Sequence, residues 1–129
     1  MIVLDTDVLI QVLRRHGSTM DWLEATAASD ELATTSLNVA ELLRGVPRRG
    51  RAQQVTHAIW AGLTEVPFGP RAARRFGRMM HDLDRAGTPV PVVDAMVAAA
   101  TLEAGGILAT WNTKHLKPLV ALETVQPDR

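Results

Sequence analysis

Ile2-Val3-Leu4-Asp5-Thr6-Asp7 lies at the start of the chain and gives the first indication of its fold. Ile2 to Leu4 is a short apolar run with two β-branched residues, which is typical of a buried strand. The three polar residues that follow can cap the first turn of a helix, and we expect that helix to continue to about Arg15.

Short apolar runs and amphipathic stretches alternate along the rest of the chain. Further strands are predicted at residues 31–35, 64–68, 107–109 and 122–125. Further helices are predicted at residues 19–28, at 37–44 with Ser36 as the cap, at 52–63, from Pro70 to the breaker-rich loop 87–91, and from Asp94 to Gly105. Strands that alternate with helices indicate an α/β fold in which helices cover both faces of a mostly parallel sheet.

The last two predicted helices differ in their patterns. The helix that begins at Pro70 has an apolar stripe, predicted to face inward, formed by Ala72, Ala73, Phe76, Met79, Met80 and Leu83. The helix that begins at Asp94 is apolar nearly all round and rich in alanine, so we expect it to be buried close against the sheet.

Length and composition limit the class of protein. The chain has 129 residues, of which 47% are hydrophobic and 22% charged, as expected for one globular domain spanning residues 1–129. No apolar run is long enough to span a bilayer, and no basic segment precedes the first strand as in a signal peptide. The absence of cysteine excludes disulfides and thiolate catalysis and fits a cytoplasmic protein.

Basic residues are gathered in two places although the formal net charge is zero. One cluster consists of Arg44, Arg48, Arg49 and Arg51, and the other of Arg71, Arg74, Arg75 and Arg78. Arginine forks suit phosphate oxygens, so the clusters are candidate nucleic-acid contacts. Solvated outer faces of helices are an equally good interpretation of both.

Acidic and polar residues follow the predicted strands or lie near helix starts. Asp5 follows the first strand, Thr110 and Asn112 follow the strand at 107–109, and Glu41 and Asp94 lie on helices. Ligands of open parallel sheets bind beyond the carboxyl ends of the strands. Three carboxylates that converge there need a cation, and oxygen ligands favour Mg²⁺ or Mn²⁺. The pattern predicts metal-dependent phosphate chemistry.

Each acid also has a purely structural interpretation. Asp5 and Asp7 can serve as helix caps, Asp94 can be the N-cap of the buried helix, and Glu41 can face solvent. From the residues alone these interpretations remain open beside the catalytic one.

Four segments in order resemble the motifs of PIN-domain nucleases. They are Val3-Leu4-Asp5-Thr6-Asp7-Val8-Leu9, Asn38-Val39-Ala40-Glu41-Leu42-Leu43-Arg44-Gly45, Asp94-Ala95-Met96-Val97-Ala98-Ala99-Ala100 and Ala109-Thr110-Trp111-Asn112-Thr113-Lys114-His115-Leu116. No single motif is specific, but their order and spacing cover nearly the whole chain. Within that family the sequence is most similar to VapC-type toxins of bacterial toxin–antitoxin pairs.

The resemblance implies a three-layer α/β/α PIN-like fold and an endoribonuclease that uses a metal-activated water. Asp5, Glu41 and Asp94 match the family's acidic positions and are the expected ligands of Mg²⁺ or Mn²⁺. Asn112 is expected to be catalytic, although the family often has an aspartate at that position, and Asp7 is a possible extra acid.

The same resemblance predicts how partners bind. Thr6, Arg44, Thr110 and Trp111 are the expected substrate-binding residues, for an RNA substrate such as a structured tRNA or rRNA. Trp111 can stack a base or pack on the protein, Arg44 can meet a phosphate or pair with Glu41, and His115 can touch phosphate or lie at the surface. Trp22 and Trp60 are assigned to packing.

Two protein partners are expected as well. One is a cognate antitoxin that blocks the acidic site, and the other is a second copy of the chain in a homodimer. The helices predicted near 19–28 and 50–63 can supply the dimer interface or belong to the core.

Two other functions compete with the nuclease. Asn112 and the neutral net charge also fit a PIN-like module that binds RNA or protein and cuts nothing. Asp5-Thr6-Asp7-Val8 also resembles the first motif of haloacid-dehalogenase-like phosphatases, in which the first aspartate is the nucleophile. That family needs a lysine followed by an acidic pair, whereas the lysines here lie only at 114 and 117.

Overall fold

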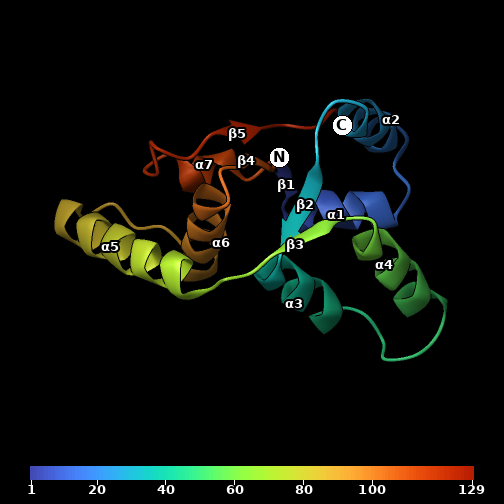
Figure 1. Ribbon diagram of the computed structural model, residues 1–129, viewed down its shortest axis with the longest axis horizontal. Coiled ribbons are helices and arrows are strands. Elements are labelled where there is room, and N and C mark those ends of the chain that lie inside the picture. The colour runs from blue at the N-terminus through green and yellow to red at the C-terminus, as the bar shows by residue number, and fades with distance from the viewer.

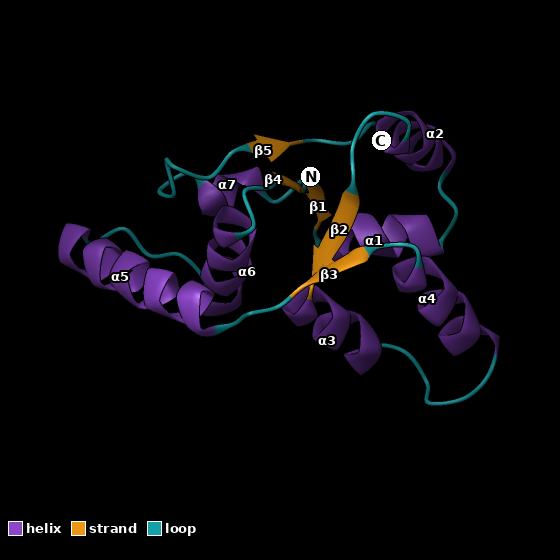
Figure 2. Ribbon diagram, in the orientation of Figure 1, coloured by secondary structure: helices purple, strands orange, loops and turns teal.

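The strand β1 (Ile2–Leu4) lies at the centre of a five-stranded sheet in the computed structural model, which describes all 129 residues (Figures 1 and 2). The other strands are β2 (Leu32–Thr35), β3 (Thr64–Val66), β4 (Ile107–Ala109) and β5 (Thr124–Val125). The order across the sheet is β3-β2-β1-β4-β5, and every pair is parallel. The predicted α/β fold with a parallel sheet is therefore confirmed.

Seven helices surround the sheet. They are α1 (Thr6–Leu13), α2 (Gly17–Ala27), α3 (Ser36–Arg44), α4 (Arg51–Ala61), α5 (Pro70–Ala86), α6 (Val92–Glu103) and α7 (Thr113–Leu116). Six of them were predicted within a few residues of their observed bounds. The short helix α7 was not, because four residues are too few for a periodic pattern. None of the helices is long and apolar enough to cross a membrane.

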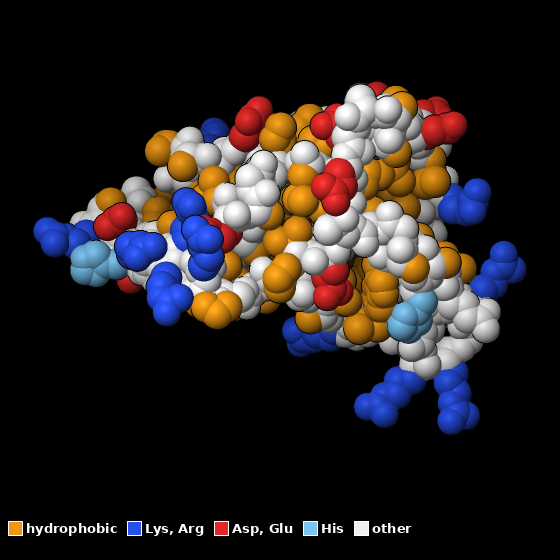
Figure 3. Space-filling model, in the orientation of Figure 1, with side chains coloured by type: hydrophobic (Ala, Val, Ile, Leu, Met, Phe, Trp, Pro, Cys, Tyr) orange, Lys and Arg blue, Asp and Glu red, His pale blue; other side chains and the backbone are white.

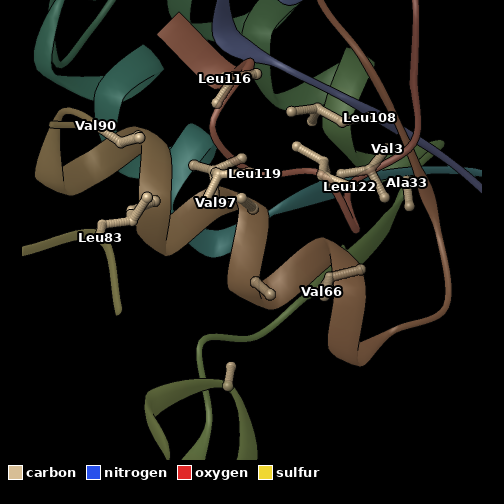
Figure 4. Close-up of a cluster of buried hydrophobic side chains, with 14 residues drawn as sticks. Val3, Ala33, Val66, Leu83, Val90, Val97, Leu108, Leu116, Leu119 and Leu122 are labelled. Atoms are coloured by element: carbon tan, nitrogen blue, oxygen red, sulfur yellow. The ribbon is translucent and has the colours of Figure 1, made fainter. Parts of the chain in front are cut away.

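Alternate residues of β1 enter two separate cores. The side chain of Val3 packs with α5, α6 and the segment after α7, in a cluster that includes Val97, Leu108 and Leu119 (Figure 4). Ile2 and Leu4 point to the opposite face, where they pack with residues of α1 and α3. Because side chains alternate along a strand, one short strand serves both faces of a three-layer fold.

Helices α2 and α4 contribute to the second core. Trp22 and Leu23 of α2, with Ile59 and Trp60 of α4, pack against the buried residues of that face. The assignment of both tryptophans to packing is confirmed. The apolar faces of α2 and α4, which were candidates for a dimer interface, contribute side chains to this core.

One detail each of the predicted helices α3 and α5 was wrong. Thr35, not Ser36, caps α3: its hydroxyl accepts a hydrogen bond from the Asn38 amide at 3.1 Å, while Ser36 is already helical. Ala73 is exposed although it was placed in the inner stripe of α5, because only one narrow side of that long helix meets α6. Ala72 and Leu83 of the same stripe are buried as expected.

Part of the second arginine cluster is tied to α6. The Nε atoms of Arg71 and Arg75 lie 3.0 and 2.7 Å from the carboxylate of Glu103. This pairing lowers the pKa of Glu103, chiefly through the hydrogen bond from Arg75. These two arginines therefore join α5 to α6 and are not free phosphate contacts.

Candidate active site

The site forms where the chain changes direction across the sheet. From β1 the chain moves to β2 and β3 on one side, and then crosses over to β4 and β5 on the other. The carboxyl ends of β1 and β4 are thus neighbours at a switch point, which is the usual place for a ligand in an open parallel sheet. Asp5 follows β1 and Thr110 follows β4 at this edge.

Asp5 is held on both carboxylate oxygens. Oδ1 accepts hydrogen bonds from the Thr6 amide at 2.8 Å and from Asn38 Nδ2 at 2.9 Å, and Oδ2 accepts from the Thr110 hydroxyl at 2.8 Å. Asp5 is also the N-cap of α1, so the structural interpretation of this residue is correct as well. One side chain therefore caps a helix and occupies the centre of the acidic site.

Asn38 is the site residue that sequence reasoning missed. It is fully buried, its Nδ2 also donates to Thr6 Oγ1 at 2.9 Å, and its Oδ1 accepts from the Thr35 hydroxyl. An amide in the otherwise apolar run Leu37 to Ala40, one helical turn before Glu41, was the available signal.

Glu41 approaches Asp5 from α3. Its Oε1 lies 3.3 Å from the hydroxyl of Thr6, which donates to it. Burial raises the pKa of Glu41, and the charges of Asp5 and Asp94 add to the effect. Glu41 is thus close enough to both aspartates to feel their charge, although it remains accessible to solvent.

Asp94 reaches the site from the first turn of α6. Pro91 is the N-cap of that helix, which begins at Val92, so Asp94 is not the cap and the predicted start was two residues late. Burial raises the pKa of Asp94, and repulsion by Asp5 raises it further. Two polar groups lie beside it: Asn112 Nδ2 donates to its Oδ2 at 3.2 Å, and His115 Nδ1 is 3.8 Å away.

Asp7 faces the loop after β4. Its carboxylate accepts hydrogen bonds from the Val8 amide at 2.7 Å and from the Trp111 amide at 2.9 Å. Burial raises the pKa of Asp7, as does the neighbouring charge of Asp5. Asp7 therefore fixes the loop that carries Thr110 and Asn112.

Of the four predicted substrate-binding residues, two lie among the acids and two lie outside them. Thr6 and Thr110 lie in the acidic site, bonded to Asn38, Glu41 or Asp5 as above. The Trp111 ring donates from Nε1 to the Pro127 carbonyl at 2.9 Å and lies 4.6 Å from the guanidinium of Arg129, a geometry that favours packing on the C-terminal segment. Arg44 is exposed at the end of α3 and forms no ion pair with Glu41.

No lysine or arginine neutralises the acids at this edge. The ion pairs of the chain involve only Glu103 with Arg71 and Arg75, and Asp94 with His115. Asp5, Glu41 and Asp94 are therefore neighbouring acids whose negative charge no lysine or arginine offsets. Such a site suits a hard cation or the basic side chain of a partner.

A family model described as the PIN domain matches residues 2–118. The chain belongs to the PIN-domain family. This membership confirms the resemblance seen in the four motifs. It also argues against the alternative of a haloacid-dehalogenase-like phosphatase.

Several relatives of this PIN domain are named ribonucleases. It is 31% identical to "Ribonuclease VapC10" of Mycobacterium tuberculosis, with 98% of each chain covered. It is 28% identical to "Ribonuclease VapC2" of Haemophilus influenzae over 95% of this chain and 94% of the relative. These relatives match this PIN domain over nearly their whole length.

Solved structures show the same fold. The chain in the structure of VapBC2 from Rickettsia felis bound to a promoter DNA fragment superposes with a TM-score of 0.89 at 22% identity, covering 99% of this PIN domain and 100% of that chain. A DNA-bound VapBC structure from Salmonella typhimurium gives 0.86 at 20% identity, covering 97% and 96%.

Proposed function

We propose that the chain is a VapC-type endoribonuclease, the toxin of a toxin–antitoxin pair, which cuts structured RNA with the help of Mg²⁺ or Mn²⁺. The observation that carries this proposal is that Asp5, Glu41 and Asp94 lie near enough at the switch point for their charges to act on one another, while no lysine or arginine pairs with them. The names of the relatives support the ribonuclease activity.

The donor set fits a hard divalent cation. Its oxygens come from carboxylates, and the raised pKa values of Glu41 and Asp94 reflect burial together with mutual repulsion, which a cation would relieve. No three acidic or histidine side chains lie close enough together to coordinate an ion, so the metal is inferred from donor chemistry and charge. When bound, such an ion activates water and stabilises the charge that develops on the phosphate.

The chain's own residues prepare the acids for this role. Asn38 and Thr110 fix the two oxygens of Asp5, so its orientation is set before any ligand arrives. Thr6 accepts from Asn38 and donates to Glu41, which connects the two acids through one hydroxyl. Asn112 donates to Asp94 and adds no charge of its own.

Cleavage of a structured RNA tests the proposal directly. Purified protein would be incubated with tRNA or an rRNA hairpin in Mg²⁺, in Mn²⁺ and in EDTA. We expect cutting only with metal, and a loss of about 10²–10³-fold in rate for Asp5→Asn, the scale of removing one electrostatic stabiliser of a transition state. Asp84→Asn is the matched control, because Asp84 is an exposed acid on α5.

A binding module without catalysis is the second candidate, favoured by the uncharged Asn112 beside Asp94. It predicts RNA that is retained intact under all metal conditions, an outcome that would exclude the nuclease.

The proposed partners are an antitoxin, a second copy of the chain and RNA, with the cytoplasm as the site of action. Solved relatives occur in VapBC complexes, which supports an antitoxin partner. We expect expression without the antitoxin to slow growth and Asp94→Asn to relieve it. Equal toxicity of the wild type and the variant would contradict this.

A further inference from the structure

The segment between Glu41 of α3 and Glu65 of β3 carries positive charge only. Residues 42–64 contain Arg44, Arg48, Arg49 and Arg51 together with His57, and no aspartate or glutamate. None of these four arginines forms an ion pair, in contrast to Arg71 and Arg75 on α5. Blue side chains project without red neighbours at the lower right of Figure 3, where Figure 1 places the loop from α3 to α4.

A polar groove lies in this segment. The α3–α4 groove has a volume of about 530 Å³ and is lined by Arg48, Arg49, Gly50, Gln53, Gln54 and His57. No hydrophobic or acidic residue lines it. An apolar ligand or a cation therefore finds no complementary group there, whereas an anion does.

Gln53 adds a polar acceptor to this groove. Its Oε1 is the buried side-chain atom of the structure that has no hydrogen-bond partner. Its Nε2 lies 3.2 Å from Nε2 of His57, on the next turn of α4. Buried polar atoms are usually paired, so an unpaired acceptor on a residue that lines the groove is an exception.

The start of α4 is electrostatically unusual. No side chain caps it, and its first turn contains no acid but begins with Arg51. The N-terminal end of a helix carries partial positive charge, so arginines there are unfavourable unless an anion lies among them. The arginines at the start of α4 therefore destabilise that helix, and such unfavourable local charges are often found at binding sites.

We infer that the α3–α4 groove binds the sugar–phosphate backbone of the RNA that enters the acidic site, an inference that rests on the proposed nuclease function. Arg44 is the last residue of α3, one helical turn after Glu41 and four residues before Arg48 in the sequence. The acids repel a polyanion, and the groove supplies the opposing attraction. Arginine forks meet phosphate oxygens, and the two glutamines that line the groove, Gln53 and Gln54, suit ribose hydroxyls.

Binding to a fluorescein-labelled RNA hairpin tests the inference. Asp94→Asn protein in EDTA would be titrated by fluorescence anisotropy over a range of salt concentrations, so that the RNA stays intact. The test variant adds Arg48→Ala, Arg49→Ala and Arg51→Ala. The charge-matched control adds Arg74→Ala, Arg78→Ala and Arg85→Ala, which are exposed arginines of α5.

We expect the groove variant to bind about tenfold more weakly, with the slope of log K against log salt smaller by about 2, as for the loss of three phosphate contacts. The α5 variant should bind like the parent, and both should keep the parental melting temperature. Equal affinity of the groove variant and the parent, an equal loss in both variants, or no RNA binding at low salt would overturn the inference.

Cleavage assays with Asp94 intact separate this inference from the proposed function. We expect the groove variant to raise KM and to keep kcat. If the groove variant cuts RNA with an unchanged KM, the nuclease function is supported and the RNA-binding role of the groove is contradicted. If RNA is bound through the arginines but is never cut, with or without metal, the RNA-binding role of the groove is supported and the nuclease function is contradicted.

Discussion

Asn38 Nδ2 donates a hydrogen bond to Asp5 Oδ1 at 2.9 Å, joining α3 to the end of β1 at the centre of the acidic site. The same amide group reaches Thr6, whose hydroxyl donates to Glu41. A fully buried, uncharged side chain therefore fixes the relative positions of two of the three acids. Asn38 is a positioning residue, since it acts through Asp5 and Thr6.

Replacing Asn38 by Ala should disable the site more than the fold. We expect kcat to fall about 10–100-fold with little change in KM, as for other groups that orient metal ligands. The free energy of unfolding should fall by about 1–3 kcal/mol, because the carboxylate of Asp5 loses a buried partner. The rise in melting temperature on adding Mn²⁺ should also shrink, a readout that reports on the acids.

Thr34→Val is the control for this variant. Thr34 is equally buried and donates to the Leu4 carbonyl at 2.9 Å, but it contacts none of the acids. It should lose stability and keep its response to Mn²⁺. If both variants respond to Mn²⁺ like the wild type, Asn38 has no positioning role.

Removing the charge of Asp94 should stabilise the metal-free protein. The pKa of Asp94 is raised in the folded state by burial and by Asp5, so ionisation at neutral pH opposes folding. Asp94→Asn keeps an acceptor for Asn112 and should therefore melt at a higher temperature than the wild type at pH 7. The gain should disappear below pH 3.8, the ordinary pKa, where the carboxyl is protonated in both states.

Glu103→Gln should behave in the opposite way. The hydrogen bond from Arg75 lowers the pKa of Glu103, so its ionised form favours folding. This variant should be less stable than the wild type at pH 7 and approach it as the pH falls through the lowered pKa. Thermal melts in EDTA at a series of pH values measure both variants, and the same sign for both would refute the electrostatic account.

Converting Asn112 to Asp should exchange stability for metal affinity. The new carboxylate would lose the hydrogen bond to Asp94 and repel it, costing about 1–2 kcal/mol without metal. With Mn²⁺ present the fourth acid should strengthen binding, and each tenfold gain in affinity adds about 1.4 kcal/mol under saturating metal.

Gln126→Glu adds the same charge elsewhere, because Gln126 is exposed and its side chain hydrogen-bonds to Thr113 and to none of the acids. It should leave the metal response unchanged. Calorimetric melts with and without Mn²⁺ distinguish the two variants, and a weaker Mn²⁺ response in Asn112→Asp than in the wild type would count against a metal site beside Asp94.

Gly106 should tolerate no side chain. A Cβ there would lie 2.8 Å from Cγ2 of Val3 and 3.4 Å from the Met1 carbonyl, because α6 ends directly against β1. We expect Gly106→Ala to cost about 1–3 kcal/mol as an overpacked core. Gly77→Ala is the control: nothing lies within 4 Å of its Cβ position in α5, and the change should add about 0.5–1 kcal/mol. Chemical denaturation measures both, and an unchanged midpoint for Gly106→Ala would contradict the close approach.

Local patterns were sufficient for much of the secondary structure. The apolar runs at 2–4 and 107–109 became β1 and β4, and the alanine-rich stretch became the buried helix α6. Errors occurred where the pattern was too short or two capping residues were adjacent, as with α7 and with Thr35 beside Ser36. Period and capping act over a few residues and can be recognised in the sequence.

The amino-acid sequence by itself determined which residues carry acid, amide and arginine groups and on which elements they lie. Only the tertiary structure decided that Asp5 meets Thr110 and Asn38, that Arg71 and Arg75 bind Glu103, and that the arginines of residues 44–51 remain unpaired. The reason is the strand order, which places β1 between β2 and β4 and so brings together side chains 33 and 105 positions apart. Contacts at such separations depend on how whole elements pack, which no local pattern specifies.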